Sequence, residues 1–111
     1  MAGRWYVEAF WDAAAAGHTR IMRALVEEGG VEVGSRSARG MTALMAAARE
    51  GKGEVARMLV SEWGTDENKA DPGDGATPLF GACENGHTEL ARMLLTEGRA
   101  NVNQATTGDG T

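Results

Sequence analysis

The chain contains little of what disulfide-rich, membrane or nucleic-acid-binding proteins need. Its single cysteine, Cys83, excludes an internal disulfide and fits a reducing compartment. Lysine and arginine total 11 against 16 aspartate and glutamate, so the formal net charge is -5 and offers no basic excess for a phosphate backbone. No segment approaches the roughly 20 apolar residues of a membrane span, and residues 5–8 (Trp-Tyr-Val-Glu) are not an apolar signal core. We therefore expect a cytoplasmic or nuclear protein that is not secreted, with no membrane and no nucleic acid among its partners.

Proline occurs only twice, but glycine occurs 16 times, and three of the glycines mark a repeat. Gly17, Gly51 and Gly86 are 34 and 35 residues apart, and we number columns by their offset from these glycines. The repeated columns are a large apolar residue at −7 (Phe10, Leu44, Leu79), alanine at −4 (Ala13, Ala47, Ala82), an aliphatic residue at +4 (Ile21, Val55, Leu90), arginine at +6 (Arg23, Arg57, Arg92), leucine at +8 (Leu25, Leu59, Leu94), an aliphatic residue at +9 (Val26, Val60, Leu95) and glutamate at +11 (Glu28, Glu62, Glu97). Such a period predicts a solenoid of stacked units with one long surface for a partner.

Each period carries the signals of two short helices. Thr77 before Pro78 predicts a helix start, because the hydroxyl can accept from orphan N–H groups and proline is tolerated at the first helical position. The repeated glycines supply the left-handed residue that ends a helix. Apolar residues at i, i+3 and i+4 predict second helices over about 53–62 and 88–97. Turns are predicted for the segments rich in Gly, Asp, Asn and Ser, at 29–41, 63–76 and 98–111.

Short motifs recur with the columns. The third copy reads Thr77-Pro78-Leu79-Phe80, Ala82-Cys83, Gly86-His87, Leu94-Leu95 and Asn103; the second copy is similar, and the first lacks the Thr-Pro start. The pattern resembles the ankyrin repeat over residues 5–111, with the first copy similar to a capping repeat. The resemblance implies an all-α fold with hairpin-like loops: an ankyrin-repeat solenoid of three stacked helix–turn–helix units, about 5–39, 40–74 and 75–111, in one domain spanning 1–111.

The chain departs from the ankyrin pattern in its loops and in one helical column. Trp11, Met45 and Phe80 replace the usual histidine of column −6, so apolar packing is expected to substitute for that histidine's hydrogen bond to threonine. The second and third loops are one residue longer than the common form, and we place the extra residues at 62–64 and 98–100.

Catalytic and metal chemistry find little support. His18 and His87 share column +1, where the family uses histidine structurally, and neither Cys-x-x-Cys nor His-x-x-x-His spacing is present. Cys83 lies in a column of small residues, so a buried and inert thiol is expected. We therefore predict no enzyme activity, no cofactor and no metal. A small metal-binding or hydrolytic protein using the two histidines is kept as a minor alternative.

The resemblance implies a non-catalytic protein–protein interaction module, because ankyrin partners bind the fingers and the inner helix face. Carried over, that groove is basic around its first finger, acidic around its second and apolar between them. Trp5 and Tyr6 extend it at the amino-terminal end. The candidate partner-binding residues are Arg36, Ala38, Arg39, Met41, Met45, Arg49, Asp71, Asp74, Ala76, Phe80, Glu84, Asn85 and Trp11.

Two further expectations concern the third unit. Asn103 resembles ankyrin asparagines hydroxylated by an oxygen-dependent asparaginyl hydroxylase, although a plain turn asparagine is the simpler interpretation. Apolar residues on the outer side of this unit are expected to be partly exposed, because solenoid ends need polar caps; the candidates are Phe80, Cys83, Leu90, Met93 and Leu94. The chain is then either a fragment of a longer array or associates end to end through the third unit. A purely structural repeat scaffold is the other alternative.

Overall fold

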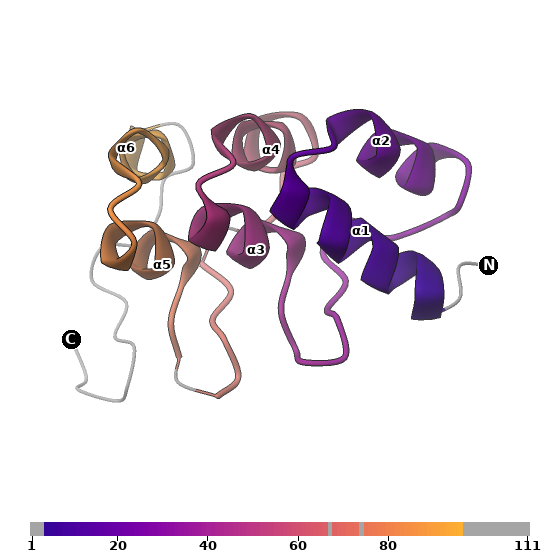
Figure 1. The fold of residues 1–111 in the computed structure, drawn as a ribbon, viewed down its shortest axis with the longest axis horizontal. Helices are drawn as coiled ribbons and strands as arrows, with labels where there is room; N and C mark the ends of the chain where they lie inside the picture. Colours follow the sequence, from indigo (N-terminus) through magenta and orange to yellow (C-terminus); the bar gives the residue numbers. More distant parts are fainter. Residues whose placement is uncertain (1–3, 67, 74, 97–111) are drawn as a thin grey trace.

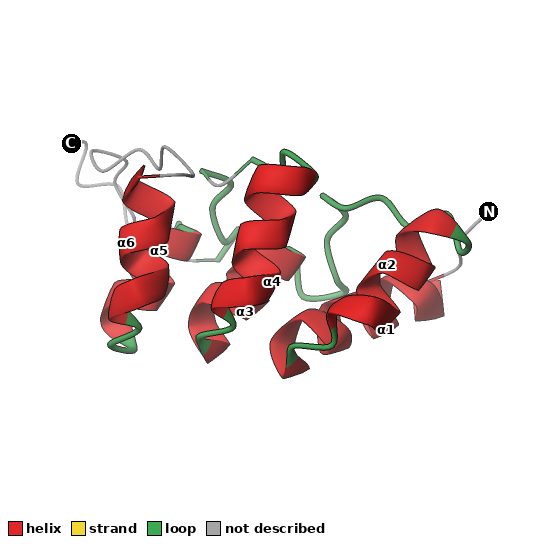
Figure 2. Ribbon diagram, turned by 90° about the horizontal axis from the view of Figure 1, so that it is seen from above, coloured by secondary structure: helices red, strands yellow, loops and turns green. Residues whose placement is uncertain are grey.

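Residues 4–66, 68–73 and 75–96 are described by a computed structural model, in which helices stand in three pairs. Unit 1 contains α1 (Arg4–Ala16) and α2 (Thr19–Glu27), unit 2 contains α3 (Ala43–Glu50) and α4 (Gly53–Arg57) with the π-helical turn η1 (Met58–Glu62), and unit 3 contains α5 (Pro78–Glu84) and α6 (Thr88–Thr96). The pairs lie side by side, with α1, α3 and α5 in one row and α2, α4 and α6 in the other (Figure 1). We call the first row the inner helices and the second row the outer helices. Figure 2 shows them as successive layers. The described residues contain no strand beyond an isolated bridge between Arg36 and Thr42, and the expected all-α repeat fold is confirmed.

Threonine caps start two of the inner helices. Thr77 Oγ1 accepts from Phe80 N at 3.3 Å, and Pro78 occupies the first helical turn, as the sequence predicts. Thr42 Oγ1 accepts from Met45 N at 3.2 Å, while the Met45 sulfur accepts from Thr42 N at 3.5 Å. The thioether therefore takes the position that a glutamate holds in a usual capping box. Met45 thus keeps a hydrogen bond to Thr42, where the sequence predicts apolar packing in its place.

The repeated glycines end the inner helices in the left-handed conformation. Gly17, Gly51 and Gly86 have φ of 85°, 74° and 74°. At Gly51 the lack of a side chain has a second use, because an added Cβ would lie 2.6 Å from the His87 ring. His87 Nε2 in turn lies 3.0 Å from the backbone oxygen of Arg49, so it joins unit 3 to unit 2. The structural interpretation of this histidine is supported.

The core runs through all three units. Its largest fully buried side chains are Phe10, Met22, Leu59, Leu94, Val55 and Pro78. Burial of each large apolar side chain contributes about 1.5–3 kcal/mol relative to leaving it in water. Ala14 and Ala48, in column −3, are fully buried, and their small size lets neighbouring inner helices approach closely.

Trp63 joins units 1 and 2 on the side of the outer helices. Its ring centroid lies 6.2 Å from that of Phe10, and the Arg23 guanidinium lies over it at 6.0 Å. Arg23 also forms an ion pair of 2.8 Å with Glu62. A tryptophan therefore stands in the column of Gly29 because it fills the space between the two units.

Two loops project to one side of the row of inner helices (Figure 1). We call residues 34–41 the first finger and residues 69–76 the second finger. The first closes with Ser37 N donating to Met41 O, and the second with Asp71 N donating to Ala76 O, both at 2.8 Å. Three residues lie between Ser37 and Met41, whereas four lie between Asp71 and Ala76.

The extra residue of the second loop therefore lies at the finger tip, and its prediction at 62–64 is wrong. Thr65 N donates to Leu59 O in unit 2 as Val31 N donates to Leu25 O in unit 1, so both units leave their outer helix with the same spacing. The corresponding prediction at 98–100 lies outside the described residues.

Candidate binding groove

A groove lies between the inner helices and the fingers. Its central hollow has a volume of about 360 Å³ and is lined by Trp11, Arg39, Met41, Ala46, Arg49, Glu50 and Asp71. A neighbouring hollow of about 250 Å³ is lined by Glu8, Trp11, Asp12, Ser37, Ala38 and Arg39. Trp11 and Arg39 belong to both hollows, so they mark the centre of the groove.

The first finger is held in place at three points. Ala38 N donates to Glu8 Oε2 of α1 at 2.7 Å. The Arg36 guanidinium donates to Gly40 O within the finger and, at 3.3 Å, to Ala70 O of the second finger. Lys69 Nζ donates to Gly34 O at 3.2 Å. The two fingers are thus tied to each other and to α1 before any partner binds.

The positions of the thirteen predicted contact residues divide into three groups. Seven are exposed and two are half-buried: Arg36, Ala38, Arg39, Arg49, Phe80, Glu84 and Asn85, then Trp11 and Asp71. Met41, Met45 and Ala76 are buried, at 4, 5 and 8 % exposure. Asp74 and the hydroxylation candidate Asn103 lie outside the described residues.

Three members of the predicted contact surface therefore need correction. Met45 is buried because its sulfur caps the start of α3. Met41 lines the central hollow but is only 4 % exposed, so it offers little surface to a partner. Ala76 closes the base of the second finger, where its carbonyl accepts from Asp71 N. Arg36 is exposed, and its guanidinium joins the two fingers.

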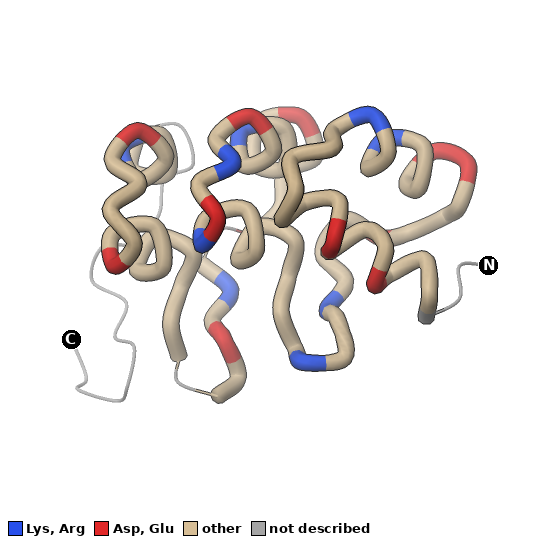
Figure 3. The backbone as a smooth tube through the Cα atoms, viewed as in Figure 1, with Lys and Arg blue, Asp and Glu red and all other residues tan. Residues whose placement is uncertain are grey.

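Charge is distributed unevenly along the groove. The charged residues of the first finger are all basic, whereas the second finger carries both signs (Figure 3). Arg49 of α3 lies 4.0 Å from Asp71 of the second finger, which partly neutralises the middle of the groove. Glu84 on α5 is exposed and acidic. The basic first finger agrees with the predicted pattern, while Lys69 makes the second finger mixed.

The sequence did not identify Glu8 and Asp12 as part of the groove. Glu8 and Asp12 lie on α1, which at 13 residues is longer than α3 and α5. Glu50, at the end of α3, lines the central hollow, which agrees with its position in the repeat. Trp11 was identified, and its buried Nε1 has no hydrogen-bond acceptor among the described residues. Such an unpaired donor costs about 1–3 kcal/mol.

Among the described residues, the other side chains capable of catalysis or metal binding do not gather into a site. No three His, Cys, Asp or Glu side chains gather as metal ligands in the part of the chain that the structure describes. Cys83 is exposed, which corrects the expectation of a buried thiol and agrees with the exposure expected for the outer side of unit 3. Its column is covered only where a further unit stacks on it, as happens to Ala14 and Ala48. Phe80 is exposed as well, but the exposure expected for Leu90, Met93 and Leu94 is wrong, because all three are buried. Within the described ranges, no helix has the length and apolar character that crossing a membrane requires.

Comparison with known proteins bears on these features. A family model described as ankyrin repeats (three copies) matches residues 5–71, and a model of the single ankyrin repeat matches residues 74–107. A search of curated protein sequences finds no match.

Proposed function

The chain belongs to the ankyrin-repeat family, and from this premise we propose that it is a non-catalytic module that binds a partner protein through the groove and its two fingers. Ankyrin repeats are generally protein–protein interaction modules and generally lack catalytic activity. The features of this chain that support the proposal are the groove's shape, its rigidity and its charge.

The observation that carries the proposal is the position of Trp11 and Arg39 where the two hollows meet. Tryptophan and arginine supply a large share of the binding energy at protein interfaces. Here an indole that is half-buried lies beside a guanidinium that is exposed. A partner side chain entering the central hollow would therefore contact an apolar wall and a cation together.

The fixed fingers favour binding because a surface that is already ordered loses less conformational entropy on association. The bonds from Glu8, Arg36 and Lys69 provide that order. A partner would meet a surface that needs little rearrangement, which is the situation in which unbound and bound backbones differ little.

The charges indicate the chemistry of the partner segment. Arg39 has no carboxylate within ion-pair distance among the described residues, so a partner carboxylate is the complement that it lacks. Glu84 at the other end favours a basic side chain. We therefore propose a segment that is acidic where it meets the first finger and basic where it meets unit 3, an arrangement that fixes orientation.

The test is capture of a partner from the source cell with the wild-type chain, followed by titration of the purified partner. Arg39→Glu is expected to weaken binding at least about tenfold. Its stability should change by less than about 0.5 kcal/mol, because the side chain is exposed. Arg20→Glu is the matched control, since Arg20 is also an exposed arginine but lies on α2, away from the groove.

Loss of binding in Arg20→Glu, with Arg39→Glu unaffected, would place the partner on the outer helices and contradict the proposal. Salt dependence gives a second criterion, because contacts between exposed charges weaken as ionic strength rises. The wild-type complex should weaken with added salt, and the Arg39→Glu complex should weaken less.

We also propose that the protein works in a reducing compartment, the cytoplasm or nucleus. The exposed thiol of Cys83 supports this, because an unpaired and accessible cysteine is easily oxidised in an oxidising compartment. Imaging of the tagged protein in its source cell tests it, and secretion into the medium would contradict it.

A further inference from the structure

The outer face of unit 3 exposes side chains whose equivalents are buried in the preceding units. Cys83 is exposed, while Ala14 and Ala48 in the same column are at 0 %. Phe80 is 42 % exposed, while Met45 in its column is at 5 %. We call this surface the unit 3 face; its residues are Phe80, Cys83, Ala91, Arg92 and Leu95.

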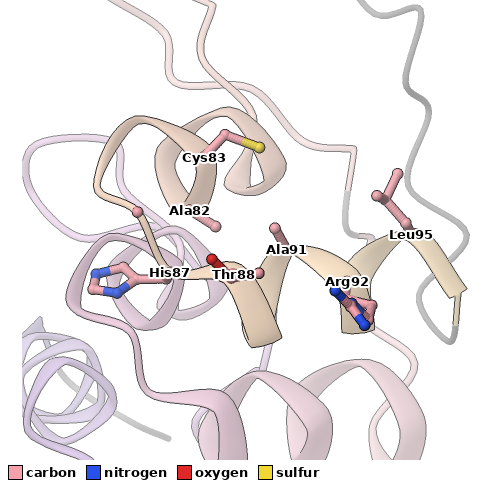
Figure 4. A pocket seen from close by; sticks show the side chains of 8 residues that line it. Ala82, Cys83, His87, Thr88, Ala91, Arg92 and Leu95 are labelled. Carbon is pink, nitrogen blue, oxygen red and sulfur yellow. The ribbon is translucent and has the colours of Figure 1, made fainter.

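The unit 3 face is hollowed. A cavity of about 370 Å³ is lined by residues of α5, α6 and the turn between them: Ala82, Cys83, Gly86, His87, Thr88, Ala91, Arg92 and Leu95 (Figure 4). The equivalent surface of unit 2 is the one that unit 3 covers. There His87 lies against Gly51, whereas no described atom lies within 4 Å of the position that a Cβ of Gly86 would occupy.

The opposite end of the molecule shows the complementary pattern. Ile21 is 51 % exposed, whereas Val55 and Leu90 in the same column are at 0 and 3 %. Val55 lines a small hollow together with Ala16 and Gly17, so this column faces the preceding unit. We call this surface the unit 1 face; its residues are Asp12, His18, Ile21, Ala24 and Glu28, of which all are exposed.

The internal interfaces of the chain show which contacts join one unit to the next. Arg23 of unit 1, in column +6, forms a 2.8 Å ion pair with Glu62 of unit 2, in column +11. His87 of unit 3, in column +1, has its Nε2 3.0 Å from the backbone oxygen of Arg49 of unit 2, in column −2. The residues for the same contacts are present at the two ends. Arg92 of column +6 lies on the unit 3 face, and Glu28 of column +11 and His18 of column +1 lie on the unit 1 face.

We propose that copies of this chain associate head to tail, with the unit 3 face of one copy stacked on the unit 1 face of another. Arg92 then pairs with Glu28 of the second copy, and His18 of the second copy reaches the carbonyl of Glu84. Ile21 covers the hollow beside Cys83. This interface joins different surfaces, so association does not close at a dimer and continues into short linear chains.

One residue opposes this stacking and keeps it weak. Asp12 is in column −5, where Ala46 is 2 % exposed and lines a hollow with Trp11 of the preceding unit. In the head-to-tail arrangement Asp12 is carried toward Phe80. A carboxylate that is buried without a partner is strongly unfavourable. Replacing it by alanine should therefore strengthen association, an effect that only stacking through the unit 1 face predicts.

The experiment is analytical ultracentrifugation of the full chain with reductant present, over about 10 μM to 1 mM, where small interfaces associate. The wild-type chain should show a reversible rise in mean mass that passes the dimer value. Asp12→Ala should tighten association at least about tenfold, and Ile21→Asp should weaken it at least about tenfold. Ser61→Asp adds the same charge at an exposed site of η1 and serves as the control, with no change expected.

Two more measurements identify the orientation. Arg92→Glu and Glu28→Arg should each weaken association about 1.5- to 5-fold, and the double variant should restore it. The rate of Cys83 labelling by a soluble maleimide should fall as wild-type protein concentration rises and stay constant for Ile21→Asp.

The outcomes that would overturn the proposal are equally distinct. Association that is lost in Leu95→Asp but indifferent to Ile21→Asp and Asp12→Ala would show two unit 3 faces paired with each other. A monomer at about 1 mM for both the wild type and Asp12→Ala would show that the faces do not stack.

Discussion

Replacing Gly51 by alanine should destabilise the protein more than replacing Gly86 by alanine, although both glycines have a φ of 74°. The conformational cost of placing alanine in the left-handed region is therefore the same for the two variants. The surroundings differ, because a Cβ on Gly51 would lie 2.6 Å from Nδ1 and 2.7 Å from Cε1 of His87. A Cβ on Gly86 would meet no described atom within 4 Å.

The magnitudes follow from these two environments. A non-glycine residue in the left-handed region costs about 1–2 kcal/mol, which is the whole loss expected for Gly86→Ala. In Gly51→Ala the imidazole must also move, so its 3.0 Å contact with Arg49 O is lost. Crowding and the lost hydrogen bond together add about 1–3 kcal/mol. Gly17→Ala should fall between the two, since its nearest neighbour is the flexible Lys52 side chain at 3.4 Å.

Urea unfolding followed by far-ultraviolet circular dichroism measures the free energies, and an unchanged m value confirms that the comparison concerns stability alone. The His87→Ala background provides the control. There, Gly51→Ala should cost no more than Gly86→Ala does in the wild type, because the ring that the new Cβ meets has been removed. Equal losses for the two glycine variants in the wild-type background would refute the idea that His87 holds units 2 and 3 together.

Two further predictions concern the interface of units 1 and 2 and the second finger. Trp63→Ala should cost about 2–4 kcal/mol in thermal or urea unfolding, because it removes the contacts with Phe10 and Arg23; a loss below about 0.5 kcal/mol would contradict the role given to that ring. Deletion of Gly73 should be tolerated within about 1 kcal/mol, since it shortens the second finger tip to the length of the first. Deletion of Gly64, which has a φ of 61°, should cost more because it shifts the register at the end of η1.

The repeat itself made the fold predictable. Columns that are apolar in all three units, such as −7 and +8, specify the core, and the threonine and glycine signals specify where helices begin and end. These are local rules that act within a few residues. The predicted outer helix over 53–62 agrees with α4 and η1 for the same reason.

The errors arose where burial depends on a neighbouring unit and not on the column alone. Met45 and Phe80 share a column, yet the first is 5 % and the second 42 % exposed. The small column of Cys83 predicts burial and the end position of unit 3 predicts exposure; the second is correct, because no described element covers the thiol. The position of the extra residue in the second loop also could not be read from composition, because glycine-rich turns occur at both ends of that loop.

The groove could be predicted in outline but not in its construction. Arg39 and Trp11 were identified from their positions in the repeat. The bonds that fix the fingers were not, since Arg36 reaches Ala70 across 34 residues and Glu8 reaches Ala38 across 30. Long-range contacts of this kind leave no periodic signal in one sequence.

Backbone amide hydrogen exchange of the chain with and without its captured partner shows whether the partner occupies the groove. We expect slower exchange in the first finger, over residues 34–41, and at the end of α3 around Glu50, with α2 and α4 unchanged. Protection confined to α2 and α4, with the first finger exchanging as in the free protein, would contradict it.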